Sequence, residues 1–331
     1  MKRPLRVLFA GCGVAAKTHS RVLRRRDGVT LMYASRSAER AEAYRRQYGG
    51  TRAFRSYEEA IASDADVVVV TTPTSLHLEL AAAALEAGKS VIVEKPAFMR
   101  SCDVDVVQAL ADRHECRVFV AENYFYKPLV TALRETIGRG DFGEVRFVSL
   151  NATKLQHRPG WRGDLAMSGG GAMFEGGIHW VSFASNLGLE VDSVEGFPTS
   201  SESSAMIVLR YVGGAVGTVT YSWELRAPFG GLRLSKIQGT EGAATFESNG
   251  VLLVTTGRRR SIGVPSLLDL TGTRAMWSDF LSCLRTGRAP RFTLQMAQRD
   301  LRFLEECQMV SAMVGDESLI SSTYADARRL R

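Results

Sequence analysis

A lysine stands where one of the apolar runs of the chain ends. Val91–Val93 is followed by Glu94-Lys95-Pro96, and this pattern predicts a buried strand that stops at the proline. A lysine held by a glutamate at a strand end can hydrogen-bond a substrate oxygen or donate a proton to it. A structural ion pair beside a turn is the alternative. Lys95 is therefore a candidate catalytic residue, and both Glu94 and Lys95 are candidate cofactor contacts.

A histidine and two other polar side chains are candidates for the same chemistry. Glu175 and His179 are four residues apart and follow the glycines Gly169–Gly171, a spacing that places both side chains on one face of a helix. Tyr124 comes just after the expected strand Arg117–Ala121. A core or capping role is the alternative for His179, and a place in a pocket wall is the alternative for Tyr124.

The first apolar run ends in a glycine turn. Leu5–Ala10 is followed by GCGVAA, and a helical pattern begins at about Ala15. In G-x-G-x-x-A the first glycine permits a tight turn, the second lets a pyrophosphate approach the backbone, and the small third residue packs helix against strand. Because the motif lies between a strand and a helix, it predicts a dinucleotide site, with a plain turn as the alternative. The expected contacts are Gly11, Cys12, Gly13, Val14 and Ala15.

The residues after the next strand indicate which dinucleotide is bound. An NAD site usually carries an acidic residue about 20 positions further on, which accepts hydrogen bonds from the ribose. Here Val29–Ala34 is followed by Ser35-Arg36-Ser37. Arg36 can form a charge-assisted pair with a 2′-phosphate, and the serines can donate further hydrogen bonds. We expect NADP(H); the alternative is a solvated Arg36 and a site that also accepts NAD(H).

Strands alternate with helices in the first half of the chain, which predicts a parallel doubly wound sheet. The strands expected there are Leu5–Ala10, Val29–Ala34, Ala65–Val70, Val91–Val93 and Arg117–Ala121, with helices over Ala15–Arg26, Ala38–Tyr48, Leu76–Ala87 and Ser101–Cys116. Short alternating strands are expected in the second half over Val145–Ala152, Val191–Phe197, Ala205–Tyr211, Ala215–Trp223, Leu232–Gln238, Ala243–Glu247 and Val251–Thr255, with loops at Pro198–Ser204 and Gly257–Leu270. A length of 331 residues suggests two domains, which we place at 1–122 and 123–331.

Composition excludes several classes of protein. With 45% apolar and 23% charged residues the chain is neither disordered nor collagen-like. Five cysteines without a C-x-x-C pair argue against a disulfide framework and against a metal site. No apolar run is long enough for a membrane helix, and we expect a cytoplasmic protein. The net charge of +7 comes mainly from arginines, but their short runs lie far apart, so we do not expect nucleic-acid binding.

Four longer motifs, in this order, carry a family resemblance. GCGVAAKTH, DADVVVVTTPTSLH, ALEAGKSVIVEKP and SGGGAMFEGGIHWV are similar to the glucose-fructose oxidoreductase, inositol dehydrogenase and rhizopine-catabolism (Gfo/Idh/MocA) family. The likeness extends over nearly the whole chain and includes Trp161-Arg162. It implies an α/β protein in which a Rossmann domain precedes an α/β domain with a large, open, mostly antiparallel sheet. The outer face of that sheet often forms the contact of a homodimer or homotetramer.

The resemblance also implies roles for the site residues. Lys95 would lie between nicotinamide and substrate, and His179 would be the general acid/base or its close partner. Glu175 stands where the family usually has Asp, and its extra methylene moves the carboxylate by about an ångström, which matters at a catalytic site. The further cofactor contacts expected are Ser35, Arg36, Ser37, Thr72, Pro73, Leu76, His77, Trp161 and Arg162.

Reversible hydride transfer is the reaction that these expectations add up to. The substrate would be a small polar molecule, namely a sugar, keto sugar, cyclitol or similar cyclic polyol, and we expect its keto group to be reduced. Two alternatives stay open. The chain could be a regulator that senses the dinucleotide without catalysis, or a glycosidase of the same fold that uses the nicotinamide transiently.

Overall fold

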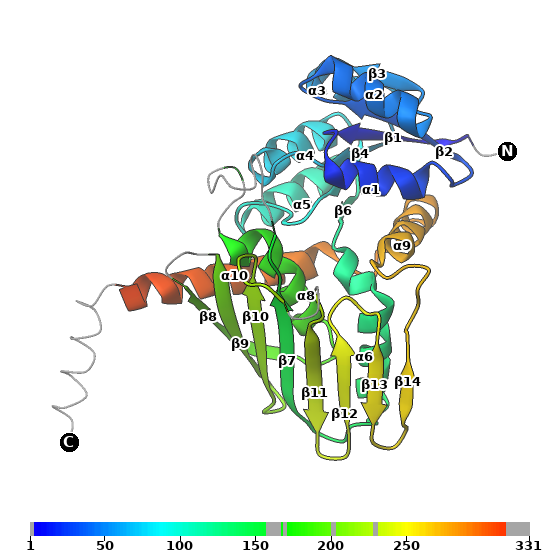
Figure 1. Ribbon diagram of the computed structural model, residues 1–331. Coiled ribbons are helices and arrows are strands. Elements are labelled where there is room, and N and C mark those ends of the chain that lie inside the picture. The colour runs from blue at the N-terminus through cyan, green and yellow to red at the C-terminus, as the bar shows by residue number, and fades with distance from the viewer. Residues whose placement is uncertain (1–2, 157–166, 168–170, 200–202, 228–230, 316–331) are drawn as a thin grey trace. The chain divides into compact units, whose positions relative to one another are not determined.

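The computed structural model describes residues 3–156, 167, 171–199, 203–227 and 231–315 (Figure 1). The chain divides into two compact units. The first comprises Met1–Lys127, Pro159–Gly169 and Thr271–Arg299, and the second comprises Pro128–Arg158, Gly170–Leu270 and Asp300–Arg331. The segment 271–299 groups with the first unit although it lies within 123–331. The domain boundary between 122 and 123 stays a prediction.

A six-stranded parallel sheet forms the centre of the first unit. Its strands are β1 (Leu5–Ala10), β2 (Val29–Ala34), β3 (Arg52–Phe54), β4 (Val67–Val70), β5 (Ser90–Val93) and β6 (Val118–Val120). They lie in the order β3-β2-β1-β4-β5-β6, and each neighbouring pair is parallel. All residues of β4 are buried valines, as expected where helices cover both faces of a sheet. Because the order reverses between β1 and β4, a ligand is expected outside the carboxyl ends of these two strands.

Helices connect the strands of this sheet (Figure 1). They are α1 (Val14–Leu23), α2 (Ala38–Tyr48), α3 (Tyr57–Ile61), η1 (Thr74–Leu76), α4 (His77–Glu86), α5 (Asp103–Arg113) and η2 (Asn123–Tyr126), joined by α9 (Thr273–Thr286) from later in the chain. Ser37 and Ser56 cap α2 and α3 by accepting backbone N–H hydrogen bonds. The strands and helices expected here are present with shifted ends, whereas β3 and α3 were not expected. Both are too short to give a periodic signal.

An eight-stranded sheet forms the centre of the second unit. Its strands are β7 (Val145–Thr153), β8 (Val191–Pro198), β9 (Ser204–Tyr211), β10 (Val216–Ser222), β11 (Leu234–Gly239), β12 (Ala243–Glu247), β13 (Leu253–Thr256) and β14 (Ser261–Gly263). They lie in the order β14-β13-β12-β11-β7-β10-β9-β8, and only the β7–β10 pair is parallel. The prediction of a loop over Gly257–Leu270 was wrong at β14, because pairing with β13 makes a strand of three residues that lack a strand pattern.

One face of this second sheet is buried and the other carries exposed apolar side chains. The remaining helical elements of the unit are α6 (Pro128–Gly138), η4 (Met173–Gly177), α8 (Ile178–Ser185) and most of α10 (Leu294–Gly315). Gly196 of β8 lets α10 approach closely, since a Cβ there would lie 2.4 Å from Cβ of Cys307. Val148, Leu150 and Ala152 of β7 are buried. Phe147, also on β7, is 56% exposed. This alternation assigns Phe147, Met206 and Leu234 to the outer face.

Candidate functional site

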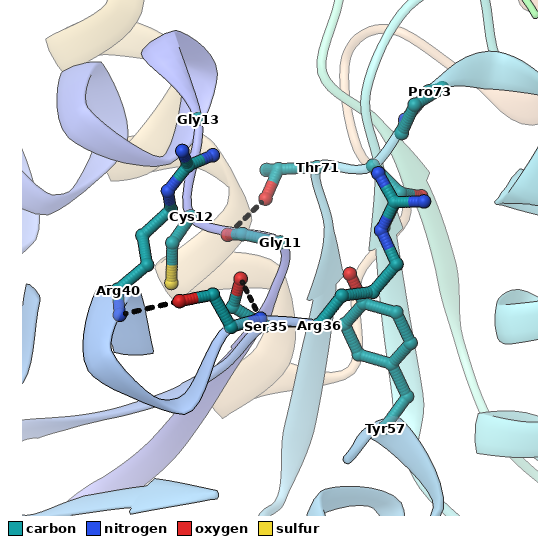
Figure 2. A pocket seen from close by; sticks show the side chains of 11 residues that line it. Gly11, Cys12, Gly13, Ser35, Arg36, Arg40, Tyr57, Thr71 and Pro73 are labelled. Atoms are coloured by element: carbon teal, nitrogen blue, oxygen red, sulfur yellow. Dashed lines mark hydrogen bonds between the residues drawn. The ribbon is translucent and has the colours of Figure 1, made fainter. Parts of the chain in front are cut away.

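A pocket of about 460 Å³ lies at the carboxyl ends of β1, β2 and β4 (Figure 2). Its lining comes from four segments that are far apart in the sequence. The residues are Gly11, Cys12, Gly13, Ser35, Arg36, Ser37, Arg40, Tyr57, Thr71, Thr72 and Pro73. The glycine turn, the Ser35-Arg36-Ser37 segment and the Thr72-Pro73 segment thus meet where the strand order predicts a ligand.

The glycine turn has no room for a side chain at its first glycine, Gly11, and has open space at its second, Gly13. Gly11 has φ +110°, and a Cβ there would lie 2.8 Å from the backbone carbonyl carbon and oxygen of Thr71. A Cβ on Gly13 would meet nothing within 4 Å, so the backbone there is accessible to a ligand. Val14 and Ala15 follow as the first residues of α1. The free N–H groups and the dipole of a helix N-terminus favour a bound phosphate at this turn.

Cys12 is a structural residue of the turn. Its thiol donates a hydrogen bond to the carbonyl oxygen of Ala34 at 3.6 Å, across to the end of β2. Burial raises the pKa of this thiol to about 12. Cys12 therefore stays protonated near neutral pH and has no nucleophilic role.

Two arginines border the pocket beyond β2. Figure 2 shows the side chains of Arg36 and Arg40 on opposite sides of it, with the Tyr57 ring beside Arg36. Burial raises the pKa of Tyr57, and the charge of Arg36 opposes that rise. Within the described part of the chain, neither guanidinium forms an ion pair. The pair, together with the hydroxyl of Ser35, suits an anion such as a 2′-phosphate. Ser37 Oγ instead donates to Glu39 Oε2 at 2.7 Å and accepts the backbone N–H of Arg40 at 3.2 Å.

Arg40 and Tyr57 were not named from the sequence. Arg40 lies in the first turn of α2, whereas Arg36 precedes that helix, and a single arginine on this charged helix has no distinctive pattern. Tyr57 begins α3, a helix of five residues that gave no signal.

His77 ties together two loops that follow β4 and β5. It is fully buried at the start of α4, with Nε2 3.0 Å from the carbonyl oxygen of Thr72. Its Nδ1 lies 3.0 Å from the carbonyl oxygen of Pro96 and 3.1 Å from that of Ala97. Burial lowers the pKa of His77, so the ring is neutral and donates to one side at a time. In this position it holds the two loops rather than facing solvent, and Leu76 precedes it at the end of η1.

Glu94 and Lys95 leave the end of β5 in a fixed backbone conformation. The backbone N–H of Lys95 donates to Oε2 of Glu94 at 3.1 Å. The lysine side chain starts from this hydrogen-bonded turn, which is half-buried. Lys95 therefore lies at the carboxyl end of β5, at the same sheet edge as the pocket.

Tyr124 lies after β6 and packs on a buried lysine. Its backbone N–H donates to Glu122 Oε1 at 2.9 Å. Lys127 Nζ lies 4.1 Å from the centroid of the Tyr124 ring, and Lys127 is 3% exposed. No motif in the sequence singled out Lys127. A cation held on the ring face gives Tyr124 a packing role in addition to any contact with a substrate.

Glu175 and His179 belong to the second unit. Glu175 lies in η4, a π-helical turn, and His179 lies in the first turn of α8, which continues it. The expected regular helix is therefore widened at Glu175, and such turns often occur at functional sites. Gly176 between them makes room for Tyr221 of β10, since a Cβ would fall 1.8 Å from the Tyr221 hydroxyl. Glu175 is 9% exposed.

Trp161 and Arg162 lie outside the described residues. In the segments that the structure describes, no group of three or more His, Cys, Asp or Glu side chains is placed to hold a metal ion. Those segments also contain no helix with the length and apolar character needed to cross a membrane.

Successive parts of the chain match two domains of one protein family. Residues 5–122 match an oxidoreductase family with an NAD-binding Rossmann fold (GFO_IDH_MocA), and residues 130–245 match the GFO/IDH/MocA C-terminal domain. Among curated proteins, the chain is similar to trans-1,2-dihydrobenzene-1,2-diol dehydrogenase of Mus musculus. The two are 27% identical over 296 residues, or 83% of this chain and 86% of the relative.

Solved structures share the fold. An aldose-aldose oxidoreductase from Caulobacter crescentus, complexed with glycerol, superposes with a TM-score of 0.83 at 20% identity, covering 94% of this chain and 98% of the other. A 3-ketoreductase from Actinomadura kijaniata, in complex with NADP and TDP-benzene, gives 0.78 at 20% identity, covering 90% and 95%. The expected fold class is thereby confirmed: a Rossmann unit and a unit with a large, mostly antiparallel sheet.

Proposed function

The chain belongs to the Gfo/Idh/MocA family of oxidoreductases, and from that premise we propose that it is an NADP(H)-dependent ketoreductase. Its substrate is a sugar, keto sugar, cyclitol or similar cyclic polyol, and the carbon that reacts alternates between hydroxyl and keto forms. Bound nicotinamide dinucleotide accepts or supplies the hydride. The observation that carries the cofactor assignment is the pair Arg36 and Arg40 at the end of the pocket where an NAD site would hold an acidic residue.

The pocket supports a dinucleotide with a 2′-phosphate in three respects. The open backbone at Gly13 admits a pyrophosphate next to the N-terminus of α1. Arg36 and Arg40 provide two cations that no described carboxylate neutralises, and a charge-assisted hydrogen bond to such a cation contributes about 1.5–3 kcal/mol. No acidic residue lines the pocket to repel the phosphate.

Lys95 and His179 supply the proton chemistry of the proposal. In the reducing direction, the Lys95 ammonium hydrogen-bonds the carbonyl oxygen and donates a proton as that oxygen gains charge. His179 is the alternative donor, and Glu175 orients it or binds a substrate hydroxyl. The relative named trans-1,2-dihydrobenzene-1,2-diol dehydrogenase and the neighbour named a 3-ketoreductase support a cyclic substrate with a hydroxyl or keto group.

A substrate screen tests the function. Purified protein is incubated with NADPH or NADP⁺ and with keto sugars, cyclitols and aromatic trans-dihydrodiols, and the absorbance of the reduced cofactor is followed. We expect turnover in at least one class, faster with NADP(H) than with NAD(H). Tight NADPH binding without turnover of any class would favour a sensing role, and cleavage of a glycoside without net change in cofactor absorbance would favour the glycosidase chemistry.

A second copy of the chain is the proposed occupant of the outer face of the second sheet. Phe147, Met206 and Leu234 on this face are 56%, 45% and 47% exposed. Eight strands about 4.8 Å apart and about 20 Å long present on the order of 700 Å², close to the roughly 800 Å² that each partner buries in a stable interface. A homodimer or homotetramer built on this face is consistent with that area and with its apolar side chains.

A further inference from the structure

The side chains of Trp277, His19 and Glu94 form a hydrogen-bonded chain within the first unit, and Glu94 directly precedes Lys95. Trp277 Nε1 on α9 lies 2.9 Å from His19 Nδ1 on α1. His19 Nε2 lies 2.5 Å from Glu94 Oε1, while the other oxygen of Glu94 accepts the backbone N–H of Lys95. Trp277 is 0% exposed and His19 is 3% exposed. This series of hydrogen bonds thus runs from the buried Trp277 to the backbone of the candidate catalytic residue Lys95.

The donors and acceptors in this series of hydrogen bonds permit one arrangement of the protons on the His19 ring. An indole N–H can donate but not accept, so Nδ1 of His19 must carry a lone pair. The proton of the neutral imidazole then lies on Nε2 and points to the Glu94 carboxylate. A second proton on Nδ1 would break the bond to Trp277 and leave two N–H groups facing each other without water. Trp277 therefore selects the neutral Nε2–H tautomer of His19.

Ring packing holds the imidazole in this orientation. Its centroid is 6.5 Å from that of Phe9 with the planes 19° apart, and 5.5 Å from that of Trp277 with the planes 78° apart. A ring flip would place the carbons Cδ2 and Cε1 where the nitrogens Nδ1 and Nε2 now lie, and it would cost both hydrogen bonds. The imidazole is thus oriented from two sides, by contacts that do not involve the pocket lining.

We propose that His19 and Trp277 are positioning residues for the Glu94-Lys95 turn. His19 lies on α1, the helix that begins at the glycine turn, so one buried imidazole links the cofactor-binding turn to the strand end that carries Lys95. Trp277 brings the later segment 271–299 into the same link. The inference rests on the proposed role of Lys95, because the distance from Lys95 to the reacting oxygen of the substrate is what this link controls.

The first test reads the tautomer directly and does not depend on activity. The full-length protein without cofactor is labelled with ¹⁵N in its histidine side chains, and His19 is assigned by comparison with His19→Phe. We expect the two-bond ¹⁵N–¹H spectrum of a neutral Nε2–H imidazole at neutral pH. An Nδ1–H tautomer or an imidazolium at His19 would overturn the proposal. In Trp277→Phe, which keeps a buried ring and removes the indole N–H, we expect a mixture of tautomers.

The second test separates positioning from stability. Trp277→Phe and His19→Phe should lower kcat by about 10- to 100-fold, the cost of displacing a reacting group by up to about 1 Å, with KM and the Kd of NADPH within about threefold of wild type. His19→Gln should recover part of kcat, because its amide N–H can replace the Nε2–H donor. Phe280→Leu is the matched control: Phe280 is 0% exposed on the same helix, 5.9 Å from the Trp277 ring, and its loss should lower Tm without changing kcat.

Comparison with Lys95→Ala distinguishes failure of this proposal from failure of the proposed function. If Lys95→Ala is inactive but Trp277→Phe and His19→Phe keep wild-type kcat, the positioning role is wrong. If Lys95→Ala keeps wild-type activity, the proposed function of Lys95 is wrong and the positioning role falls with it, whichever tautomer His19 adopts.

Discussion

The hydroxyl of Thr71 donates a hydrogen bond to the carbonyl oxygen of Gly11 over 2.8 Å, so the turn after β1 is tied to the end of β4. The same closeness forbids a side chain at Gly11. Gly11→Ala combines a positive φ with a Cβ that collides with the Thr71 backbone, and we expect it to lower the free energy of unfolding by at least about 2 kcal/mol. Urea denaturation without cofactor measures this loss.

Gly13→Ala is the matched control. A Cβ at Gly13 meets open space in the protein alone, so the free energy of unfolding should change by no more than about 1 kcal/mol. The affinity for NADPH should nevertheless fall, because the added methyl occupies the approach of the pyrophosphate. Equal stability losses in the two variants would contradict this account of the turn.

Arg36 and Arg40 should determine cofactor preference together. Arg36→Asp should weaken NADPH binding by about one to two orders of magnitude, since a charge-assisted pair worth about 1.5–3 kcal/mol is replaced by repulsion. Arg40→Ala should weaken it less, and the double variant most. NADH, which lacks the 2′-phosphate, should bind all three variants within a few fold of wild type. Fluorescence titration gives these constants, and an unchanged NADPH affinity in Arg36→Asp would rule out the assignment.

The sequence predicted the parts of the site that short motifs encode. Gly11 and Arg36 were named from the sequence, and both line the pocket, because residues directly after the first two strands of a dinucleotide fold lie at its ligand-binding edge. Arg40 was missed because a single arginine on a charged helix has no distinctive pattern. The link between His19 and Trp277 joins residues 258 positions apart, and no local periodicity reports such a contact. β14 was missed for a related reason, since its strand conformation depends on pairing with β13.

His77 should make stability fall in mild acid. Burial lowers its pKa from an ordinary value near 6.5, so below that value the unfolded chain binds a proton that the folded chain excludes. Stability is therefore complete above about pH 6.5 and is lost as the pH falls from there toward the folded-state pKa, by at most about 1.4 kcal/mol per pH unit for this group. His77→Asn removes the titrating ring. Its unfolding free energy, measured by denaturation between about pH 7 and pH 5, should depend less on pH than that of wild type, even if it is lower throughout.

Charges on the outer face of the second sheet should dissociate the proposed oligomer. In Phe147→Asp/Met206→Asp, two-fold symmetry places the new carboxylates of both copies in the interface. Burying these unpaired charges away from water costs free energy and destabilises the interface. Light scattering after size exclusion should give a larger mass for wild type and the mass of one chain for the variant. Val212→Asp is the control, because Val212 is 63% exposed just beyond the end of β9. A monomeric wild-type protein would contradict the proposed use of this face.

Lys95→Ala should separate binding from turnover. Lys95 does not line the pocket that holds the glycine turn and the two arginines, so the Kd of NADPH should stay within about threefold of wild type. Loss of the proton donor should lower kcat by at least about 100-fold, the usual contribution of a positioned general acid. If His179 delivers the proton instead, His179→Gln will show the larger loss of kcat and Lys95→Ala will chiefly raise KM, because the ammonium then only binds the substrate oxygen. Steady-state kinetics of the two variants on the substrate found in the screen therefore assign the donor.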